Sequence, residues 1–433
     1  MQELRGTQTR GDAYMVVVLA AGYFLAFLDR QSLALFVIPI EHDLHLTDLQ
    51  MGLLLGFAFG LLYALLGVPC GLLADRVNRR RLIMAGIAFW SVSTLVCALA
   101  SDAVQLFVGR IGVGIGEATL APAATSMIAD AFAPWQRGRA FGVFSLGTTF
   151  GAGTASLLGA GVIALLAQAQ IQAPVLGTLR AWQVTLAIVA LAAVPVIVAL
   201  WSVREPPRRA RAGALALPVP AIAAHLLRHW RLYALIYLSN VLASLMSYAF
   251  YPWVPAAMER LWHVSRASIG VHLGLMIIGL SSIGIYGSGW LVDRLNLRGR
   301  HHGLALLGTA VFVVLAVVAG VMFQLPHVGL TWMLIGLYIL LVHIYFPFAL
   351  LALSIVTPPG AMAALAALNF MFTGILGLSL GPTLVVLVAR AFFPAPSGTA
   401  RAISAVCMGL ALLGALSYAL LIRPLRSFAR PAA

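Results

Sequence analysis

The sequence predicts an all-α polytopic membrane protein with twelve transmembrane helices in two six-helix, parallel-repeat halves. Three observations predict this fold class: the apolar composition, the distribution of arginine, and a motif that occurs once in each half. Of the 433 residues, 62% are apolar and only 9% are charged, against about 25% charged residues in a typical soluble domain. No soluble packing could bury so much apolar surface. This excludes a soluble enzyme, a secreted disulfide-stabilised domain and a nucleic-acid-binding domain.

Apolar segments long enough to cross a bilayer as helices recur along the whole chain. Charges, Pro and Gly turns and polar clusters separate them, and the least marked separations are at Gln168–Gly177 and Thr357–Gly360. The predicted spans are residues 14–40, 48–74, 81–101, 103–131, 137–167, 181–203, 230–257, 267–292, 302–325, 329–356, 360–389 and 402–423.

The basic charge of the chain reports its topology. All 27 basic residues are arginine, and the net charge is +14. With both termini in the cytoplasm, twenty arginines fall in cytoplasmic segments and five in outer loops, while Arg30 and Arg110 lie within spans. This asymmetry follows the positive-inside rule. We therefore expect a multi-pass protein of the plasma (inner) membrane with both termini cytoplasmic and no nucleic-acid partner.

A repeat divides the chain near its middle. The longest hydrophilic stretch follows the sixth span, which predicts an N-terminal half at 1–203, a cytoplasmic linker at 204–229 and a C-terminal half at 230–433. The segment GLLADRVNRR at 71–80 recurs as GWLVDRLNLR at 289–298, after the second helix of each half. Two six-helix halves in parallel repeat are an architecture of secondary transporters.

Four charged residues lie within the predicted spans: Asp29 and Arg30 on the first helix, and Arg110 and Glu117 on the fourth. A charge at the bilayer centre costs at least about 2.5–3.5 kcal/mol on insertion scales. Asp29 and Glu117 lie about 16 and 21 Å below the outer helix ends, so we expect Arg30 to pair with Glu117. The pair is either a static link between helices or a proton switch that responds when substrate competes for the arginine. Asp29, a third charge at this depth, favours the switch.

The remaining candidates are mostly neutral. A polar stripe on helix 7 suits either cavity lining or interface packing: Tyr237, Asn240, Ser244, Tyr248 and Tyr251. The candidate substrate-binding residues are Tyr23, Phe27, Arg30, Glu117, Ser244, Tyr248, His343, Asn369 and Thr373. A cavity charged on one wall and aromatic on the other favours an amphiphile or a hydrophobic anion.

The repeated motif supplies a candidate conformational latch. Its residues are Gly71, Asp75, Arg76, Arg80, Asp293 and Arg294. Asp75 is expected to end a helix beside arginines, where it could cap that helix or pair with the facing half. The alternative is that the arginines only anchor the loop in the cytoplasm.

These motifs resemble those of a known family. The G-x-L-x-D-R-x-x-R-R loop is similar to the signature loop of the major facilitator superfamily, with Asn78 where that family usually has Gly. Asn tolerates the left-handed turn expected there. RIGVGIGEA at 110–118 resembles the fourth-helix Arg motif of proton-coupled members. With DRQSLAL at 29–35 and IADAFAPWQRGRA at 128–140, the chain is similar to the spinster-like branch.

The spinster-like resemblance implies a substrate class and a set of coupling residues. Animal members of that branch move lysophospholipids and sphingoid phospholipids. By the resemblance, Asp29, Arg30 and Glu117 correspond to the coupling residues and Arg110 to the fourth-helix Arg. A weaker resemblance runs to organic-anion symporters, while WQRGRAFGVF and WSVREPPRR favour the spinster-like branch. Helix 5 lacks the Gly-Pro pair of drug antiporters, and its five glycines predict close packing: Gly138, Gly142, Gly147, Gly151 and Gly153.

The expected activity is transport driven by a gradient. The sequence holds no Walker A loop, metal-ligand cluster or nucleophile–base constellation, so we expect no cofactor, no metal and no enzyme activity. The favoured function is proton-coupled transport of a lysophospholipid- or sphingoid-type amphiphile by alternating access, with a monomer working on small substrates and protons in the lipid bilayer. The alternative is a proton-coupled symporter of a small organic anion. A membrane-embedded enzyme or receptor is the least favoured.

Overall fold

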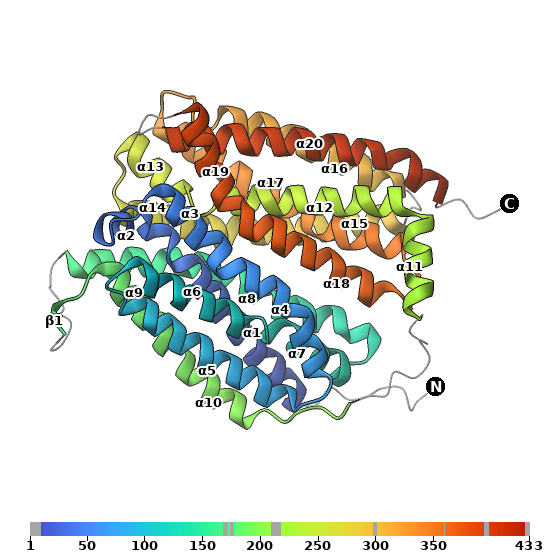
Figure 1. The fold of residues 1–433 in the computed structure, drawn as a ribbon. Helices are drawn as coiled ribbons and strands as arrows, with labels where there is room; N and C mark the ends of the chain where they lie inside the picture. Colours follow the sequence, from blue (N-terminus) through green and yellow to red (C-terminus); the bar gives the residue numbers. More distant parts are fainter. Residues whose placement is uncertain are drawn as a thin grey trace. The chain divides into compact units, whose positions relative to one another are not determined.

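The structure, a computed structural model, describes residues 10–167, 172–173, 177–208, 218–297, 301–358, 360–393 and 398–428. Apart from connecting turns, these residues form helices and one antiparallel pair of two-residue strands, β1 (Gln172–Ala173) and β2 (Gly177–Thr178) (Figure 1). Eleven of the described helices are long and apolar enough to cross a membrane. A shorter apolar stretch, Val328–Ile344, belongs to α17 (Val328–Val356), which corresponds to the tenth predicted span and brings the number of candidate spans to twelve. The predicted fold class is confirmed.

The chain divides into two compact units, and each is described by itself. One comprises Met1–Ala210 with Val264–Ile278, and the other comprises Arg211–His263 with Gly279–Ala433. The boundary in the eighth span falls within a π-helical segment, η3 (Ile277–Ser281). Part of the predicted linker, residues 209–217, lies outside the described residues. The division into halves at 1–203 and 230–433 stays a prediction.

The first unit contains the helices that hold the four charges predicted within spans. Its helices are α1 (Arg10–Ser32), η1 (Ala34–Phe36), α2 (Val37–Asp43), α3 (Asp48–Leu53), η2 (Leu54–Ala58), α4 (Phe59–Ala74), α5 (Arg79–Ala98), α6 (Ala103–Glu117), α7 (Leu120–Ala131), α8 (Pro134–Leu166), α9 (Ala181–Leu191), α10 (Ala193–Ser202) and α14 (Arg266–Met276). The first predicted span is interrupted two residues after Arg30, and the fourth is interrupted immediately after Glu117. Both interruptions therefore adjoin the charges.

The second unit carries the neutral polar stripe. Its helices are α11 (Val219–Arg228), α12 (Trp230–Phe250), α13 (Val254–Trp262), α15 (Ser282–Leu297), α16 (His301–Val321), α17, α18 (Met362–Phe372), η4 (Thr373–Leu378), α19 (Ser379–Phe392) and α20 (Gly398–Phe428). The first copy of the repeated motif ends α4 before Asp75, whereas in the second copy α15 continues helically through Asp293 to Leu297. The two copies therefore differ in backbone conformation.

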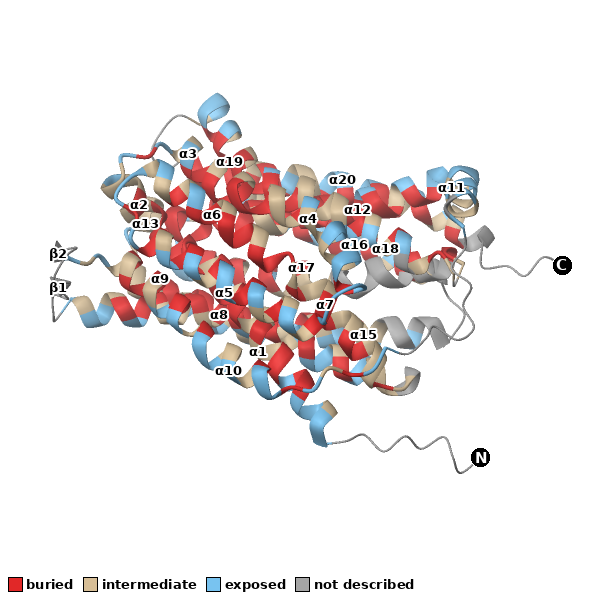
Figure 2. Cartoon of the chain, turned by 60° about the horizontal axis from the view of Figure 1, so that its bottom comes forward, coloured by how far each residue is buried: buried red, intermediate tan, exposed pale blue. Residues whose placement is uncertain are grey.

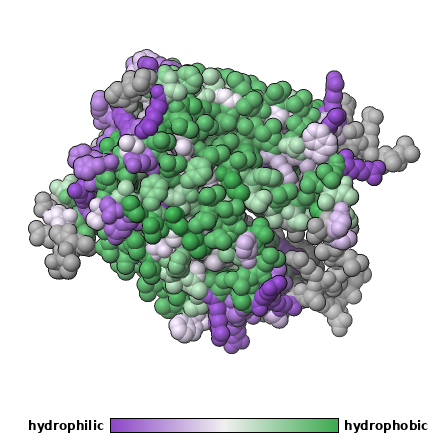
Figure 3. Space-filling model, in the orientation of Figure 1, coloured by the Kyte–Doolittle hydropathy of each residue, from purple (hydrophilic) through white to green (hydrophobic). Residues whose placement is uncertain are grey.

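Apolar side chains cover the outward faces of the helices. Val104 and Trp201 are each 71% exposed, and Val92 and Val198 are each 63% exposed. Figure 2 shows exposed residues along α10 and buried residues along α6. On the face shown in Figure 3, hydrophobic residues cover the flanks of the helices and hydrophilic ones gather at helix ends. Lipid tails are the solvent that such a surface requires, which agrees with a multi-pass membrane protein.

Glycines of α8 allow its close approach to neighbouring helices. A Cβ added at Gly147 would lie 2.6 Å from a carbonyl oxygen of α1, and one at Gly151 would collide with the next turn of α1. A Cβ at Gly153 would lie 2.7 Å from a carbonyl oxygen of α14. Close packing is confirmed at these three positions. It is wrong for Gly138 and Gly142, where an added Cβ meets nothing within 4 Å.

Candidate functional site

Glycines on two faces of α6 determine how near its neighbours come. Those facing α5 are Gly109, Gly112 and Gly116. On another face, a Cβ at Gly114 would collide with the carbonyl oxygen of Phe59 at the start of α4. Arg110 lies four residues before Gly114 and Glu117 three residues after it, so all three share one face of α6. The glycine therefore lets the charged face of α6 lie directly against the backbone of α4.

Arg30 and Glu117 form a buried ion pair. The Arg30 Nη2 donates to Glu117 Oε2 at 2.7 Å, and the two residues are 8% and 2% exposed. The pair joins the last turn of α1 to the end of α6, as the sequence predicts. The other carboxylate oxygen, Glu117 Oε1, is buried and has no hydrogen-bond partner among the described residues. The carboxylate is thus only half satisfied by its arginine.

Aromatic rings surround the Arg30 guanidinium. Its Cζ lies 4.7 Å from the ring centre of Phe27, 4.6 Å from that of Phe59 and 4.7 Å from that of Tyr63. These distances fall within cation–π range. Phe27 is a predicted site residue, whereas Phe59 and Tyr63 are not. Their signal in the sequence is an aromatic pair at i, i+4 in an otherwise largely aliphatic span.

A second buried pair lies beside the first. Arg110 Nη1 donates to Asp29 Oδ1 at 3.2 Å, and both side chains are 1% exposed. The hydroxyl of Thr94, on α5, donates a short hydrogen bond to Asp29 Oδ2. Arg110 also lies 5.1 Å from the ring of Phe59, which therefore contacts both arginines. The sequence identifies both charges but predicts neither their pairing nor Thr94.

The cluster holds two carboxylates and two guanidinium groups, so its net charge is zero. A proton on either carboxylate would leave an uncompensated arginine in an apolar setting, and that arginine would then attract another anion. Arg30 presents its charge at the centre of an aromatic enclosure, and Glu117 presents a second oxygen. The arrangement therefore places a cation with aromatic walls beside a carboxylate oxygen that no described residue satisfies.

The predicted latch residues do not behave alike. Asp75 follows α4 as its C-terminal cap; it and Arg76 are exposed and form no ion pair within the described part of the chain. Arg80 Nη1 donates to the carbonyls of Trp201, near the end of α10, and of Val203, directly after it, each at 3.0 Å. A Cβ at Gly71 would lie 3.7 Å from α7. Arg294 lies 5.2 Å from the ring centre of its neighbour on α15, Trp290.

The side chain of Asp293 lies outside the described residues. The role of all six residues as a latch stays a prediction.

Arg79, a further arginine of the first copy of the repeated motif, is buried. Arg79 is 1% exposed, pairs with Asp130 at the end of α7, and donates from Nε to Glu205 Oε1 at 3.0 Å. It also donates to Ser126 Oγ at 3.0 Å and to the Pro206 carbonyl at 2.8 Å. The sequence offered a signal in the acids of IADAFAP and WSVREPP, but their proximity depends on the tertiary structure.

The expectation of a left-handed turn at Asn78 is wrong. Its φ and ψ are −65° and 113°, and its side chain accepts a hydrogen bond from the Arg81 amide at 2.9 Å. Asn78 is therefore the N-cap of α5, a position that requires an extended backbone and an accepting side chain. Among the described non-glycine residues, positive φ occurs at His45 and His263.

The polar stripe of α12 packs against another helix. Asn240 Nδ2 donates to Asn369 Oδ1 at 2.9 Å, and Ser244 Oγ donates to the Thr373 carbonyl at 3.0 Å. The Tyr237 hydroxyl donates to a carbonyl of α18 at 2.9 Å. At these positions the geometry agrees with the interface-packing alternative. Substrate binding by Ser244, Asn369 and Thr373 stays a prediction.

The other predicted binding residues are held locally. His343 Nδ1 lies 2.8 Å from the carbonyl oxygen of the preceding helical turn and 3.5 Å from the Tyr251 hydroxyl. Tyr248 is half-buried on α12. In the first unit Tyr23 stacks on Phe144, with ring centres 4.4 Å apart. Tyr23 therefore contacts α8, and its ring also packs edge-on against Phe27, with ring centres 5.3 Å apart.

Paired charges buried within a bundle of membrane-spanning helices are typical of secondary transporters. Residues 19–382 match the family model described as Major Facilitator Superfamily, and the chain belongs to that superfamily. Its homologues are transporters rather than enzymes, as the sequence predicts.

Several proteins are similar to this chain in sequence. An MFS-type efflux pump of Mycolicibacterium smegmatis is 27% identical over 413 residues, 93% of this chain and 91% of that protein. Protein spinster homolog 1 of Xenopus tropicalis is 31% identical over 210 residues, 48% of this chain and 37% of that protein. The match thus spans little more than a third of the spinster homologue's length.

A crystal structure of a bacterial homologue of the human lysosomal transporter spinster, inward-facing and unoccupied, has a TM-score of 0.84 and 21% identity to this chain. The match covers 98% of this chain and 100% of the chain in that crystal structure, so the two proteins share their fold. The resemblance to the spinster-like branch is confirmed by the spinster homologues, which match about half of this chain.

Proposed function

We propose that this protein is a proton-coupled transporter that moves a lipid-like amphiphile, of lysophospholipid or sphingoid type, by alternating access. The observation that carries the proposal is the buried Arg30–Glu117 pair, 2.7 Å between Nη2 and Oε2, within its aromatic enclosure. In this proposal both termini are cytoplasmic and the protein works as a monomer in the plasma membrane.

Coupling follows from competition for Arg30. When Glu117 takes up a proton it loses its charge, and the attraction that holds the guanidinium at the carboxylate weakens. A phosphate of the substrate headgroup then replaces the carboxylate as the partner of Arg30, since guanidinium binds phosphate well. Release of substrate restores the ion pair and favours loss of the proton. The nearby Asp29–Arg110 pair, also buried, is proposed to share in this proton exchange.

The surroundings of Arg30 favour an amphiphile over a fully polar solute. Three aromatic rings lie within 4.7 Å of the guanidinium carbon, so any anion that reaches it must pass against apolar surface. In an amphiphile, the charged headgroup can pair with the guanidinium while the hydrocarbon chain packs against the aromatic rings around it. A sugar or nucleoside would need many polar partners, and the described side chains around Arg30 supply few.

Transport into proteoliposomes under an imposed pH gradient tests the proposal. Labelled lysophospholipid and labelled small carboxylates are supplied separately to the wild type, to Glu117→Gln and to Asp102→Asn. Asp102 is the exposed N-cap of the same helix and accepts a hydrogen bond from Gln105 that Asn can also accept. It is therefore a matched control that changes an acid without touching the buried pair.

We expect the wild type and Asp102→Asn to accumulate lysophospholipid uphill, and Glu117→Gln to bind or exchange it without accumulation. Uphill transport by Glu117→Gln at the wild-type rate would eliminate the proton switch. A static ion pair predicts loss of thermal stability in Glu117→Gln with coupling intact. Uptake of carboxylate with no movement of lysophospholipid would replace the amphiphile by the organic-anion alternative.

A further inference from the structure

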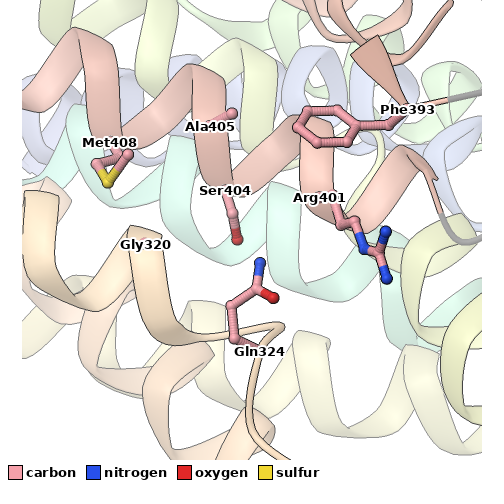
Figure 4. A pocket seen from close by; sticks show the side chains of 7 residues that line it. All are labelled: Gly320, Gln324, Phe393, Arg401, Ser404, Ala405 and Met408. Carbon is pink, nitrogen blue, oxygen red and sulfur yellow. The ribbon is translucent and has the colours of Figure 1, made fainter.

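A cavity of about 400 Å³ lies in the second unit, between the end of α16 and the beginning of α20 (Figure 4). Its polar lining consists of Arg401, Ser404 and Gln324, and its apolar lining includes Phe393 and Met408. All of these residues belong to the second unit, whereas the paired charges belong to the first. The transport mechanism proposed above uses none of them.

The charge of the cavity is positive. Among the described lining residues, the one that carries a charge is Arg401, an exposed residue in the first turns of α20. In the part of the chain that the structure describes, no acidic side chain lines the cavity and Arg401 forms no ion pair. A guanidinium with its donors free binds phosphate or carboxylate oxygens. The cavity therefore favours an anionic group at Arg401.

A buried hydroxyl opens onto the same space. Ser404 is 3% exposed, and its Oγ has no hydrogen-bond partner among the described residues. Figure 4 shows the Ser404 hydroxyl and the Gln324 side-chain amide pointing toward one another across the cavity. A buried hydroxyl without a partner is unfavourable. A ligand oxygen placed between Ser404, Gln324 and Arg401 would remove that cost.

Apolar surface continues from the cavity along the two helices. Met408 is 39% exposed and lies seven residues beyond Arg401, about 10 Å further along the helix axis. Leu412 on α20 and Val317 on α16 continue these faces at helical spacing and are 53% and 62% exposed. Since α16 and α20 are spans, the polar group lies at the membrane surface and the apolar strip runs into the hydrocarbon.

Gly320 lets the Met408 side chain pack closely against α16 in the lining of the cavity. A Cβ added there would lie 2.9 Å from the Met408 sulfur. A side chain at this position would therefore displace Met408 or fill the space beside it. Met408 therefore forms apolar lining that leads from the polar end of the cavity toward the exposed apolar strip.

We propose that this cavity binds a membrane glycerophospholipid with an anionic headgroup. The phosphate contacts Arg401, headgroup oxygens accept or donate hydrogen bonds at Ser404 and Gln324, and an acyl chain follows Met408 and Leu412. The site lies at the lipid-facing edge of the second unit. A soluble phosphate would use only the polar end and gain nothing from the apolar strip.

Native mass spectrometry of the purified protein tests the site. Equal amounts of phosphatidylglycerol and phosphatidylcholine of matched chain length are added, and the bound lipids are counted for the wild type, Arg401→Gln and Arg390→Gln. Arg390 is an exposed arginine of α19 that does not line the cavity. We expect Arg401→Gln to reduce the preference for phosphatidylglycerol about fivefold, and Arg390→Gln to leave it unchanged.

Two further measurements make the result decisive. Ser404→Ala, a smaller change, should also weaken phosphatidylglycerol retention and leave phosphatidylcholine retention unchanged, and melting curves in phosphatidylcholine report whether each variant is folded. An unchanged lipid preference in folded Arg401→Gln overturns the proposal. So does displacement of phosphatidylglycerol by an equal concentration of sn-glycerol 3-phosphate, which would indicate a soluble-anion site. Because no gradient or transport is involved, failure here and failure of the transport proposal are distinguishable.

Discussion

Replacement of Arg79 by Met isolates the contribution of the buried charge that links three segments of the first unit. The arginine side chain is 1% exposed and is shared between Asp130 and Glu205. Met keeps most of the aliphatic volume but removes the guanidinium, so two carboxylates lose their common partner. Arg81→Met is the matched control, because Arg81 lies on the same turn with an exposed side chain and uses only its backbone amide to contact Asn78.

The expected loss of stability in Arg79→Met depends on how exposed the two carboxylates are. Removing one partner of a fully buried ion pair costs about 3–5 kcal/mol. The Asp130 and Glu205 side chains are 18% and 16% exposed, so water compensates part of the loss and we expect about 2–4 kcal/mol. For a unit of this size that corresponds to a fall in Tm of about 5–15 °C. Intrinsic tryptophan fluorescence during heating in detergent measures it.

A triple variant separates lost charge balance from lost packing. Adding Asp130→Asn and Glu205→Gln to Arg79→Met removes the two uncompensated charges, and we expect it to regain most of the lost Tm. The reasoning is refuted if Arg79→Met melts at the same temperature as Arg81→Met. It is also refuted if the triple variant is no more stable than the single one, because packing rather than charge would then account for the loss.

Three further predictions use the same melting assay. Gly114→Ala forces a Cβ into a carbonyl of α4 and should lower the free energy of unfolding by about 1–3 kcal/mol. Gly142→Ala should be neutral or stabilise the protein by up to about 1 kcal/mol. Equal effects of the two variants would contradict the close approach of α4 to α6. Asn240→Leu should cost about 1–3 kcal/mol by leaving Asn369 unpaired, and the double replacement by Leu should cost less. Asn78→Ala should cost about 1 kcal/mol and Asn78→Gly only a few tenths; stabilisation by Gly would mean that the turn is left-handed after all.

Features that depend on local chemistry were predictable from the sequence. Span positions follow from apolar runs, because transfer into a bilayer is nearly additive along a helix. The Arg30–Glu117 pair was predictable for a related reason: the rise per residue places both groups at similar depth, and a lone buried charge requires a partner. The interruptions of α1 and α6 beside these residues were not predicted. The Asn78 turn was predicted wrongly, because an N-cap and a left-handed turn suit similar residues.

The tertiary structure alone decided which distant side chains meet. Asp29 could have faced any helix of its unit, and packing of α5 and α6 gave it Thr94 and Arg110. Phe59 reaches both arginines because a glycine of α6 admits the backbone of α4. The helix 7 stripe was compatible with a cavity or an interface, and α18 lies against it. Partner choice depends on the faces that helices far apart in sequence turn toward one another, and close backbone contacts set those faces through the whole unit.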